Sequence, residues 1–266
     1  MSINTTSLAD TTFVIRKDTD GVAELTLNRP KQYNALSMKM LEAILSELTA
    51  IGKDDRIKVV ILGAAGKAFC PGHDLKEIRN HRNRTFGDTL FAKCTEMMLK
   101  IRSLQQPVIA KVQGVATAAG CQLVATCDLA IAANHARFAT SGINYGIFCS
   151  TPAVPLSRTI HPKKALEMLL TGEFLSAQEA QAEGLINKAV PAEALDEAVW
   201  KMANTIAQKA PDALKIGKSM FYEQMMMDER SAYAYASDKI VCNILEPDAK
   251  EGLDAFAEKR KPKFKS

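Results

Sequence analysis

The chain of 266 residues is long enough for one large α/β domain or for a domain with an appendage, and its hydrophobic share of 47% is near the globular average. Its net charge of +4 is small and its basic residues are spread out, which gives little support to nucleic-acid binding. Its six cysteines lack the close pairing of a zinc site or a disulfide framework, so we expect reduced thiols.

The N-terminal segment predicts a cytosolic protein. Residues 1–10 show no basic region followed by an apolar core, as a secretory signal would. A transit peptide would be rich in arginine and poor in acids, whereas this segment contains Asp10 and no arginine before Arg16. No later segment has the roughly 18 uninterrupted apolar residues of a membrane span.

The first half of the chain has an α/β rhythm. Residues 22–27 and 59–62 are predicted strands, and residues 37–51 between them are a predicted helix. Short apolar strands are also expected at 107–112 and 129–133. The predicted helix carries a core-facing stripe at helical spacing, formed by Leu41, Ile44, Leu45, Leu48 and Ile51.

From about residue 162 onward the pattern becomes helical. Ser176 followed by Glu179 forms a capping box, and helices are expected over 192–210, 212–225 and 231–245. We therefore divide the chain into an α/β core over 1–205 and a helical region over 206–266. The apolar residues of that region either form a subunit interface or pack on the chain's own core; they include Met220, Phe221, Met225, Met226 and Met227.

Two stretches combine small residues with a following helical pattern: residues 69–78, which read Phe-Cys-Pro-Gly-His-Asp-Leu-Lys-Glu-Ile, and residues 114–123, which read Gly-Val-Ala-Thr-Ala-Ala-Gly-Cys-Gln-Leu. Free N–H groups at the first turn of a helix stabilise negative charge that develops on a carbonyl oxygen. Together the two stretches predict an oxyanion hole.

Several segments, in their order and spacing, resemble the crotonase, or enoyl-CoA hydratase/isomerase, superfamily over nearly the whole chain. They are residues 27–36, 69–78, 107–114, 127–128, 170–172 with 176–180, and 252–261. The resemblance implies an α/β core of repeated ββα units wound into a spiral, with a C-terminal helical trimerisation region. It also implies trimers that often pair into hexamers, and a CoA thioester as substrate with no separate cofactor and no metal.

Carried over by position, the resemblance makes the backbone N–H groups of His73 and Ala119 the oxyanion donors. It places Ala35, Pro71 and Gly72 in the backbone that contacts CoA. For the CoA phosphates the candidates are Lys31 and the basic tail over 259–265; the alternative is that these side chains are simply solvated. The His73 ring either bonds a substrate or points outward.

The chain departs from the family's hydratases at both catalytic glutamates, which are replaced by Gln122 and Gly142. Glutamine cannot take a proton at physiological pH, and glycine has no side chain. Shortly after position 142, residues 144–152 resemble one branch of the superfamily. There Cys149 and Ser150 are candidates for a nucleophile, an acid or a water holder; the alternatives are a small wall residue for Cys149 and a helix cap for Ser150.

Two classes of function remain. One is an acyl-CoA enzyme working through an enolate or a tetrahedral oxyanion, such as an isomerase, decarboxylase, thioesterase or weak hydratase. The other is a catalytically silent acyl-CoA binding protein. We favour the enzyme. The motifs of serine hydrolases, dinucleotide-binding enzymes and zinc proteases are absent from the sequence.

Overall fold

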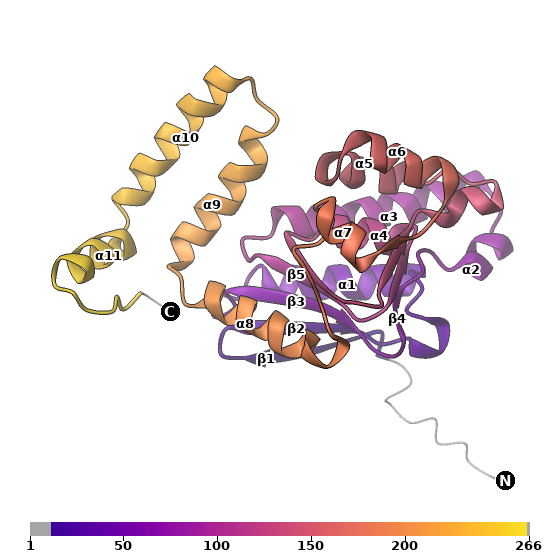
Figure 1. Cartoon of the computed structure of the whole chain (residues 1–266), viewed down its shortest axis with the longest axis horizontal. Coiled ribbons are helices and arrows are strands. Elements are labelled where there is room, and N and C mark those ends of the chain that lie inside the picture. The colour runs from indigo at the N-terminus through magenta and orange to yellow at the C-terminus, as the bar shows by residue number, and fades with distance from the viewer. Residues whose placement is uncertain (1–11, 265–266) are drawn as a thin grey trace, which may run out of the picture.

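The computed structural model describes residues 12–264, which form an α/β core with a helical arm (Figure 1). A six-stranded sheet has the order β1-β2-β3-β5-β7-β10, in which only the β1–β2 pair is antiparallel. Its strands are β1 (Val14–Thr19), β2 (Val22–Leu27), β3 (Val59–Ala64), β5 (Val108–Val112), β7 (Leu129–Ala133) and β10 (Lys188–Val190). β2 and β7 have the predicted bounds.

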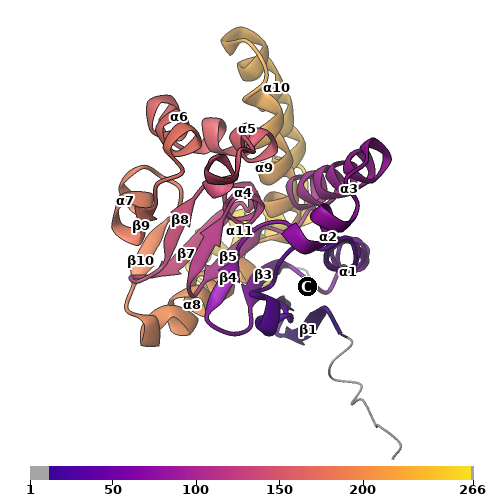
Figure 2. The same ribbon diagram turned by 90° about the vertical axis from the view of Figure 1, so that its right-hand side faces the viewer.

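A second, smaller sheet stands beside the first and has the order β4-β6-β8-β9 (Figure 2). Its strands are β4 (Ala68–Cys70), β6 (Val115–Thr117), β8 (Arg137–Ala139) and β9 (Leu175–Ser176). Successive strands of the chain alternate between the two sheets from β3 to β8, so β4 and β6 end next to each other. This arrangement brings the two glycine-containing stretches together.

The predicted first helix is α1 (Met38–Ile51), and Ser37 caps it by accepting a hydrogen bond from the Met40 N–H. Of its predicted stripe, Leu45 is only partly buried and the other four residues are fully buried. Helices α2 (Leu75–Asn80), α3 (Arg84–Ser103) and α4 (Ala119–Thr126) follow, and then α5 (Ser150–Thr159), α6 (Pro162–Thr171) and α7 (Ala177–Ala182). Single-turn 3-10 helices are η2 (Pro30–Gln32), η3 (Ser141–Tyr145) and η4 (Ala192–Ala194).

Helix α8 (Leu195–Ala207) packs on the large sheet, and the capping box predicted at Ser176 is present at the start of α7. The arm follows as α9 (Pro211–Gln224), α10 (Glu229–Ile244) and α11 (Pro247–Ala257), and it extends away from the core (Figure 1). The predicted division at 205/206 falls in the last turn of α8 and stays a prediction.

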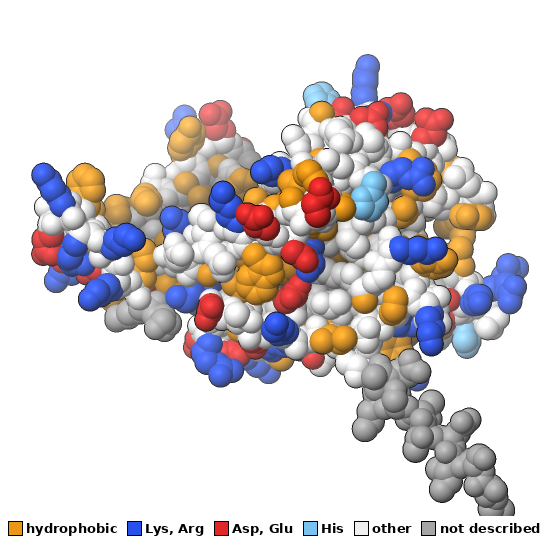
Figure 3. Space-filling view, turned by 60° about the horizontal axis from the view of Figure 1, so that its bottom comes forward, with side chains coloured by type: hydrophobic (Ala, Val, Ile, Leu, Met, Phe, Trp, Pro, Cys, Tyr) orange, Lys and Arg blue, Asp and Glu red, His pale blue; other side chains and the backbone are white. Residues whose placement is uncertain are grey.

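The arm carries large apolar side chains on its surface. They include Phe221, Met225, Met226, Tyr233, Ile240, Val241, Ile244, Leu245, Leu253 and Phe256, all more than half exposed. On the face drawn in Figure 3, acidic and basic side chains are interspersed. None of the described helices combines the length and the apolarity needed to cross a bilayer.

One buried ion pair attaches the arm to the core. Lys218 of α9 donates to Asp128 at 2.7 Å and to the carbonyls of Ile101 and Gln106, and Tyr222 donates its hydroxyl to the other Asp128 oxygen at 2.8 Å. Asp128 also accepts from the Val108 N–H, so its carboxylate joins α9 to the start of β5. The pair fixes α9 against the carboxyl end of α3.

Candidate active site

The first predicted oxyanion donor lies just before α2. Leu36 forms an isolated parallel bridge with His73, in which its N–H donates to the Gly72 carbonyl and its carbonyl accepts from Asp74. This pattern turns the His73 N–H away from Leu36, and residues 12–264 provide no acceptor for it. The Asp74 carboxylate caps α2 by accepting from Lys76 and Glu77, as an acid at a helix start is expected to do.

The second predicted donor is the N–H of Ala119, the first residue of α4. Ala118 before it has φ +49° and ψ −120°, a conformation that non-glycine residues adopt at a cost of about 1–3 kcal/mol. Its side chain cannot cap the helix, and no acceptor for the Ala119 N–H is found in the described part of the chain. The strained backbone thus leaves one free donor at the positive end of α4.

Glycine holds the two donors side by side. Gly72 has φ +102°, and a Cβ placed on it would lie 2.9 Å from the Ala118 Cβ and 3.1 Å from the Ala119 nitrogen. A Cβ on Gly120 would lie 2.0 Å from the Cys70 carbonyl oxygen, so α4 approaches β4 as closely as glycine permits. The backbone segments that carry the two predicted donors are therefore in close contact.

The His73 ring is buried rather than pointing outward. Its Nδ1 lies 3.3 Å from the Leu36 carbonyl oxygen, and its edge packs against Phe91 of α3 with 5.2 Å between ring centroids. Burial lowers the pKa of His73, so the ring is neutral at pH 7. Because a carbonyl only accepts, Nδ1 carries the hydrogen and Nε2 is left as a buried acceptor with no partner among the described residues.

The two positions of the missing glutamates have different surroundings. Gln122 is 4% exposed, one turn after Ala119, and its Oε1 has no partner within residues 12–264. At Gly142, in η3, a Cβ would lie 2.8 Å from the Cys149 Sγ and 2.6 Å from the Ile147 carbonyl oxygen. The space that a side chain at 142 needs is therefore already occupied.

Cys149 is buried, and burial raises its thiol pKa although a backbone hydrogen bond from Gly142 opposes the shift. A protonated thiol can donate a proton but is a weak nucleophile. Ser150 is exposed and is the first residue of α5, where its hydroxyl donates only weakly, at 3.4 Å, to Phe148. The cap expected from Ser150 is absent, because the N-cap position falls on Cys149, whose side chain makes no capping bond.

The predicted CoA-contacting residues lie around the first donor. The Ala35 carbonyl accepts from both Arg29 and the Ser37 N–H, so its two lone pairs are occupied. The Pro71 carbonyl accepts from Thr117 at 2.9 Å and keeps one lone pair for a ligand. Lys31 is exposed in η2. The basic tail follows α11, at the end of the molecule opposite α2, and the structure therefore does not bring it to these residues within one chain (Figure 1). Lys265 of that tail is outside the described residues.

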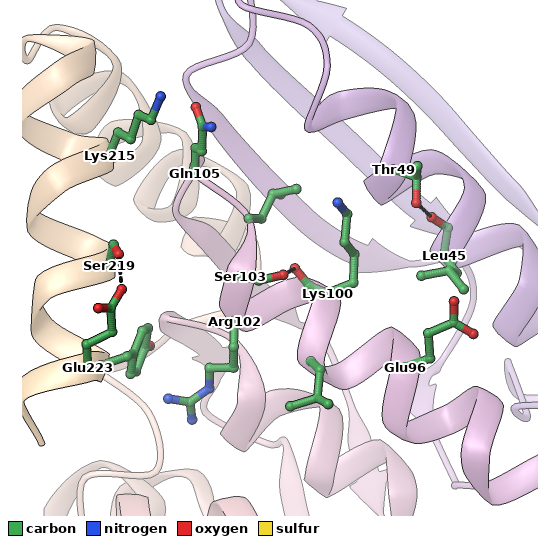
Figure 4. A pocket seen from close by; sticks show the side chains of 13 residues that line it. Leu45, Thr49, Glu96, Lys100, Arg102, Ser103, Gln105, Lys215, Ser219 and Glu223 are labelled. Carbon is green, nitrogen blue, oxygen red and sulfur yellow. Dashed lines mark hydrogen bonds between the residues drawn. The ribbon is translucent and has the colours of Figure 1, made fainter. Parts of the chain in front are cut away.

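Two large cavities lie against α9. A cleft of about 880 Å³ separates α9 from α1 and α3 and is lined by charged side chains of both signs, but by none of the predicted site residues (Figure 4). The other cavity, of about 650 Å³, reaches Gln122 and is mostly apolar. We call it the α4–α9 cavity; it is open to solvent and bordered by α3, α4, α5 and α9, with Met98, Leu99, Val154, Pro155, Phe221 and Met225 among its lining residues.

The family model described as Enoyl-CoA hydratase/isomerase matches residues 17–266. The chain belongs to this family. Rat "Enoyl-CoA hydratase domain-containing protein 3, mitochondrial" is 45% identical over 243 residues, which cover 91% of this chain and 81% of the relative. This is the branch that residues 144–152 resemble.

Solved structures confirm the crotonase-type fold. An enoyl-CoA hydratase of Mycobacterium smegmatis has a TM-score of 0.93 and 50% identity, with 95% of this chain and 98% of that chain covered. Human enoyl-CoA hydratase domain-containing protein 3 also has a TM-score of 0.93, at 42% identity, with 95% and 100% covered.

The relatives overturn the cytosolic prediction. Five vertebrate relatives at 41–45% identity are named as mitochondrial proteins. The prediction rested on the composition of the N-terminal segment, and residues 1–11 lie outside the described part of the chain. A targeting segment is an address that takes no part in the fold, so its apparent absence does not determine the compartment.

Proposed function

We propose that the protein is an enzyme that acts on acyl-CoA thioesters through an enolate or a tetrahedral oxyanion. The thioester oxygen would lie between the N–H groups of His73 and Ala119. The single observation that supports this proposal most is that these two N–H groups are free and adjacent. The family supports the CoA thioester as the ligand class.

The physical basis is differential stabilisation. A thioester carbonyl acidifies its α-carbon because an enolate places negative charge on the oxygen, and preorganised donors bind that charge more strongly than the neutral carbonyl. Removing one such donor typically costs about 3–4 kcal/mol of barrier height in other enzymes. Because both donors belong to the main chain, replacing the two glutamates leaves them in place.

Proton transfer needs a group other than a glutamate at 122 or 142. His73 Nε2 is a buried acceptor without a partner in the described chain, on the residue that also supplies the first donor. We propose it as the base that takes the α-proton. Cys149, protonated beside Gly142, is the candidate for returning a proton to the substrate. These roles favour isomerisation or decarboxylation over efficient hydration, which needs an activated water.

A catalytically silent acyl-CoA binding protein is the second candidate. It is favoured by one observation, that the wall formed by Gln122 and Gly142 holds no carboxylate. The two candidates differ in whether the bound thioester forms an enolate, which exchanges its α-protons with solvent.

The test is α-proton exchange of butyryl-CoA in deuterium oxide, followed by mass spectrometry. The enzyme should exchange these protons faster than buffer, and Ala119→Pro should lower the rate about 100-fold or more, because proline lacks the N–H. Proline suits the first position of a helix but also restricts the backbone of the preceding Ala118, so circular dichroism is measured alongside to separate loss of the donor from loss of the fold. Calorimetric binding without exchange would support the silent binder. Absence of binding by several acyl-CoAs would contradict both.

We also propose a homotrimer or hexamer as the working form. The support is the row of exposed apolar side chains on α10 and α11, which no other part of the described chain covers.

A further inference from the structure

The α4–α9 cavity holds two arginines without acidic partners. Arg102 of α3 and Arg158 of α5 both line it, and neither has a carboxylate within 4 Å among the described residues. Arg102 donates one bond to the Ala125 carbonyl at 3.1 Å and packs over the Tyr222 ring; Arg158 donates one bond to the Val154 carbonyl at 2.9 Å. Each guanidinium has five N–H donors, so most of them remain unused.

Three other polar side chains of the cavity already have partners, whereas the Gln122 Oε1 has none among the described residues. The Asp128 carboxylate is occupied by Lys218 and Tyr222, and the Thr126 and Thr159 hydroxyls donate to backbone carbonyls. The wall is otherwise apolar. A mostly apolar cavity whose lining includes two guanidiniums without an acidic partner fits a ligand with a hydrocarbon body and an anionic end.

Helix α4 connects the second predicted donor to the cavity. Gln122, one turn after Ala119, lines the cavity, and so does Ala125, whose carbonyl accepts from the Arg102 guanidinium. Ala125 lies six positions after Ala119 on α4, which is about 9 Å at 1.5 Å per residue. An extended chain advances about 1.2 Å per bond, so roughly eight bonds connect a thioester carbonyl to the guanidinium group.

Helix α9 forms the wall of the cavity next to Arg102. Tyr222 supports the Arg102 guanidinium, with 4.3 Å from its central carbon to the ring centroid, and is itself held by Asp128. This contact restricts the rotamers of Arg102, so less conformational entropy is lost when its guanidinium binds a ligand. Phe221, next to Tyr222 on α9, and Met225, the C-cap residue of α9, lie along the apolar wall.

We infer that the α4–α9 cavity receives the acyl chain of the substrate and that the preferred acyl chain has about eight to ten carbons and ends in a carboxylate. This inference rests on the proposed function, because it assumes a thioester held at His73 and Ala119. The Arg102 and Arg158 guanidiniums bind the terminal carboxylate, while the methylene groups contact the apolar wall.

The test compares decanoyl-CoA with the monothioester decanedioyl-CoA by calorimetry on the full chain. The wild type should bind the diacid thioester at least tenfold more tightly, and added salt should reduce this preference. Butanedioyl-CoA, whose chain is too short to reach Arg102, should show no preference over butyryl-CoA.

Arg102→Gln and Arg158→Gln should each reduce the preference at least threefold without weakening decanoyl-CoA binding. Arg158 is exposed, so its variant keeps the test valid if loss of the Arg102 contact to α4 disturbs folding. Arg56→Gln is the matched control, because Arg56 is exposed in the loop before β3 and does not line the cavity.

Equal binding of the two decanoyl compounds by the wild type, or a preference that survives in the Arg102→Gln/Arg158→Gln variant, would overturn the inference and leave the proposed function intact. If no CoA thioester binds at all, the proposed function fails and the inference fails with it.

Discussion

The sulfur of Cys149 occupies the space into which a side chain on Gly142 would project, with 2.8 Å between Sγ and the position of such a Cβ. The absence of a glutamate at 142 and the presence of a thiol at 149 are therefore linked, because the thiol fills the volume that a side chain at 142 would need. A glutamate cannot be restored at 142 while Cys149 keeps its place.

The first prediction follows from this contact. Gly142→Glu should destabilise the protein by about 1–3 kcal/mol, the usual cost of overpacking, and should not create hydratase activity. Adding Cys149→Ala should recover part of the stability, because the sulfur is removed while the contact with the Ile147 carbonyl remains. Urea unfolding and crotonyl-CoA hydration measure the two effects. Gln122→Glu alone serves as the control for adding a buried carboxylate. A stable, active Gly142→Glu variant would contradict the described packing.

The second prediction concerns the separation of the two donors. Gly72→Ala should lower the α-proton exchange rate about 100-fold, because the new Cβ pushes against Ala118 and Ala119 and alanine is strained at φ +102°. The control is Gly217→Ala in α9, where a Cβ has nothing within 4 Å. That change should leave the exchange rate unaltered and raise helix stability by up to about 1 kcal/mol. Normal exchange in Gly72→Ala would argue against the oxyanion hole.

Part of the fold and of the candidate site was predictable from the sequence, and part was not. The strands at 22–27 and 129–133 were predicted with their bounds, because a buried strand leaves an apolar run that turn residues interrupt. The burial of His73 was not predictable, since Phe91 covers its ring from a different helix. The contact between Gly142 and Cys149 depends on the path of η3 and the following loop, which leaves no periodic signal. The bond from Lys218 to Asp128 joins residues 90 positions apart.

The third prediction addresses that buried pair. Lys218 and Asp128 side chains are only 7% and 11% exposed, and burial lowers the pKa of Lys218 in spite of its acidic partner. Lys218→Met should therefore lower the free energy of unfolding by about 3–5 kcal/mol, because it leaves the buried Asp128 carboxylate without its ammonium partner. Lys215→Met, at an exposed position of the same helix, should stay within about 0.5 kcal/mol of the wild type. Chemical denaturation measures both. A cost below 1 kcal/mol for Lys218→Met would show that the pair does not hold α9.

The fourth prediction is a pH dependence caused by His73. Burial lowers its pKa below the usual 6.5, so below pH 6.5 the unfolded chain binds a proton that the folded chain does not. The free energy of unfolding should consequently fall as the pH decreases from 6.5 towards the folded pKa. The His73→Gln variant should lack this fall in the free energy of unfolding. The control is His135→Gln, at an exposed turn, which should keep it. Unfolding curves at pH 7.5 and pH 5.5 give the free energies to compare. An identical change in unfolding free energy between these pH values for wild type and His73→Gln would contradict a buried neutral ring.

The fifth prediction concerns assembly. Light scattering should give three or six times the 29.0 kDa chain mass. Leu245→Glu, at a side chain that is 79% exposed, should shift the protein towards monomers, because it places a charge in an apolar interface. Asn243→Glu adds the same charge at a neighbouring polar position and should have a smaller effect. A wild-type monomer at micromolar concentration would contradict the proposed oligomer.

The main-chain origin of the oxyanion donors has an evolutionary consequence. In the proposed site, the backbone around Ala118, Gly72 and Gly120 sets where the thioester oxygen lies, and the residues at 122, 142 and 149 set which protons move. Mutations can therefore change the second set while the first stays intact. A lineage can lose one reaction and acquire another without an intervening stage in which its thioester is no longer held.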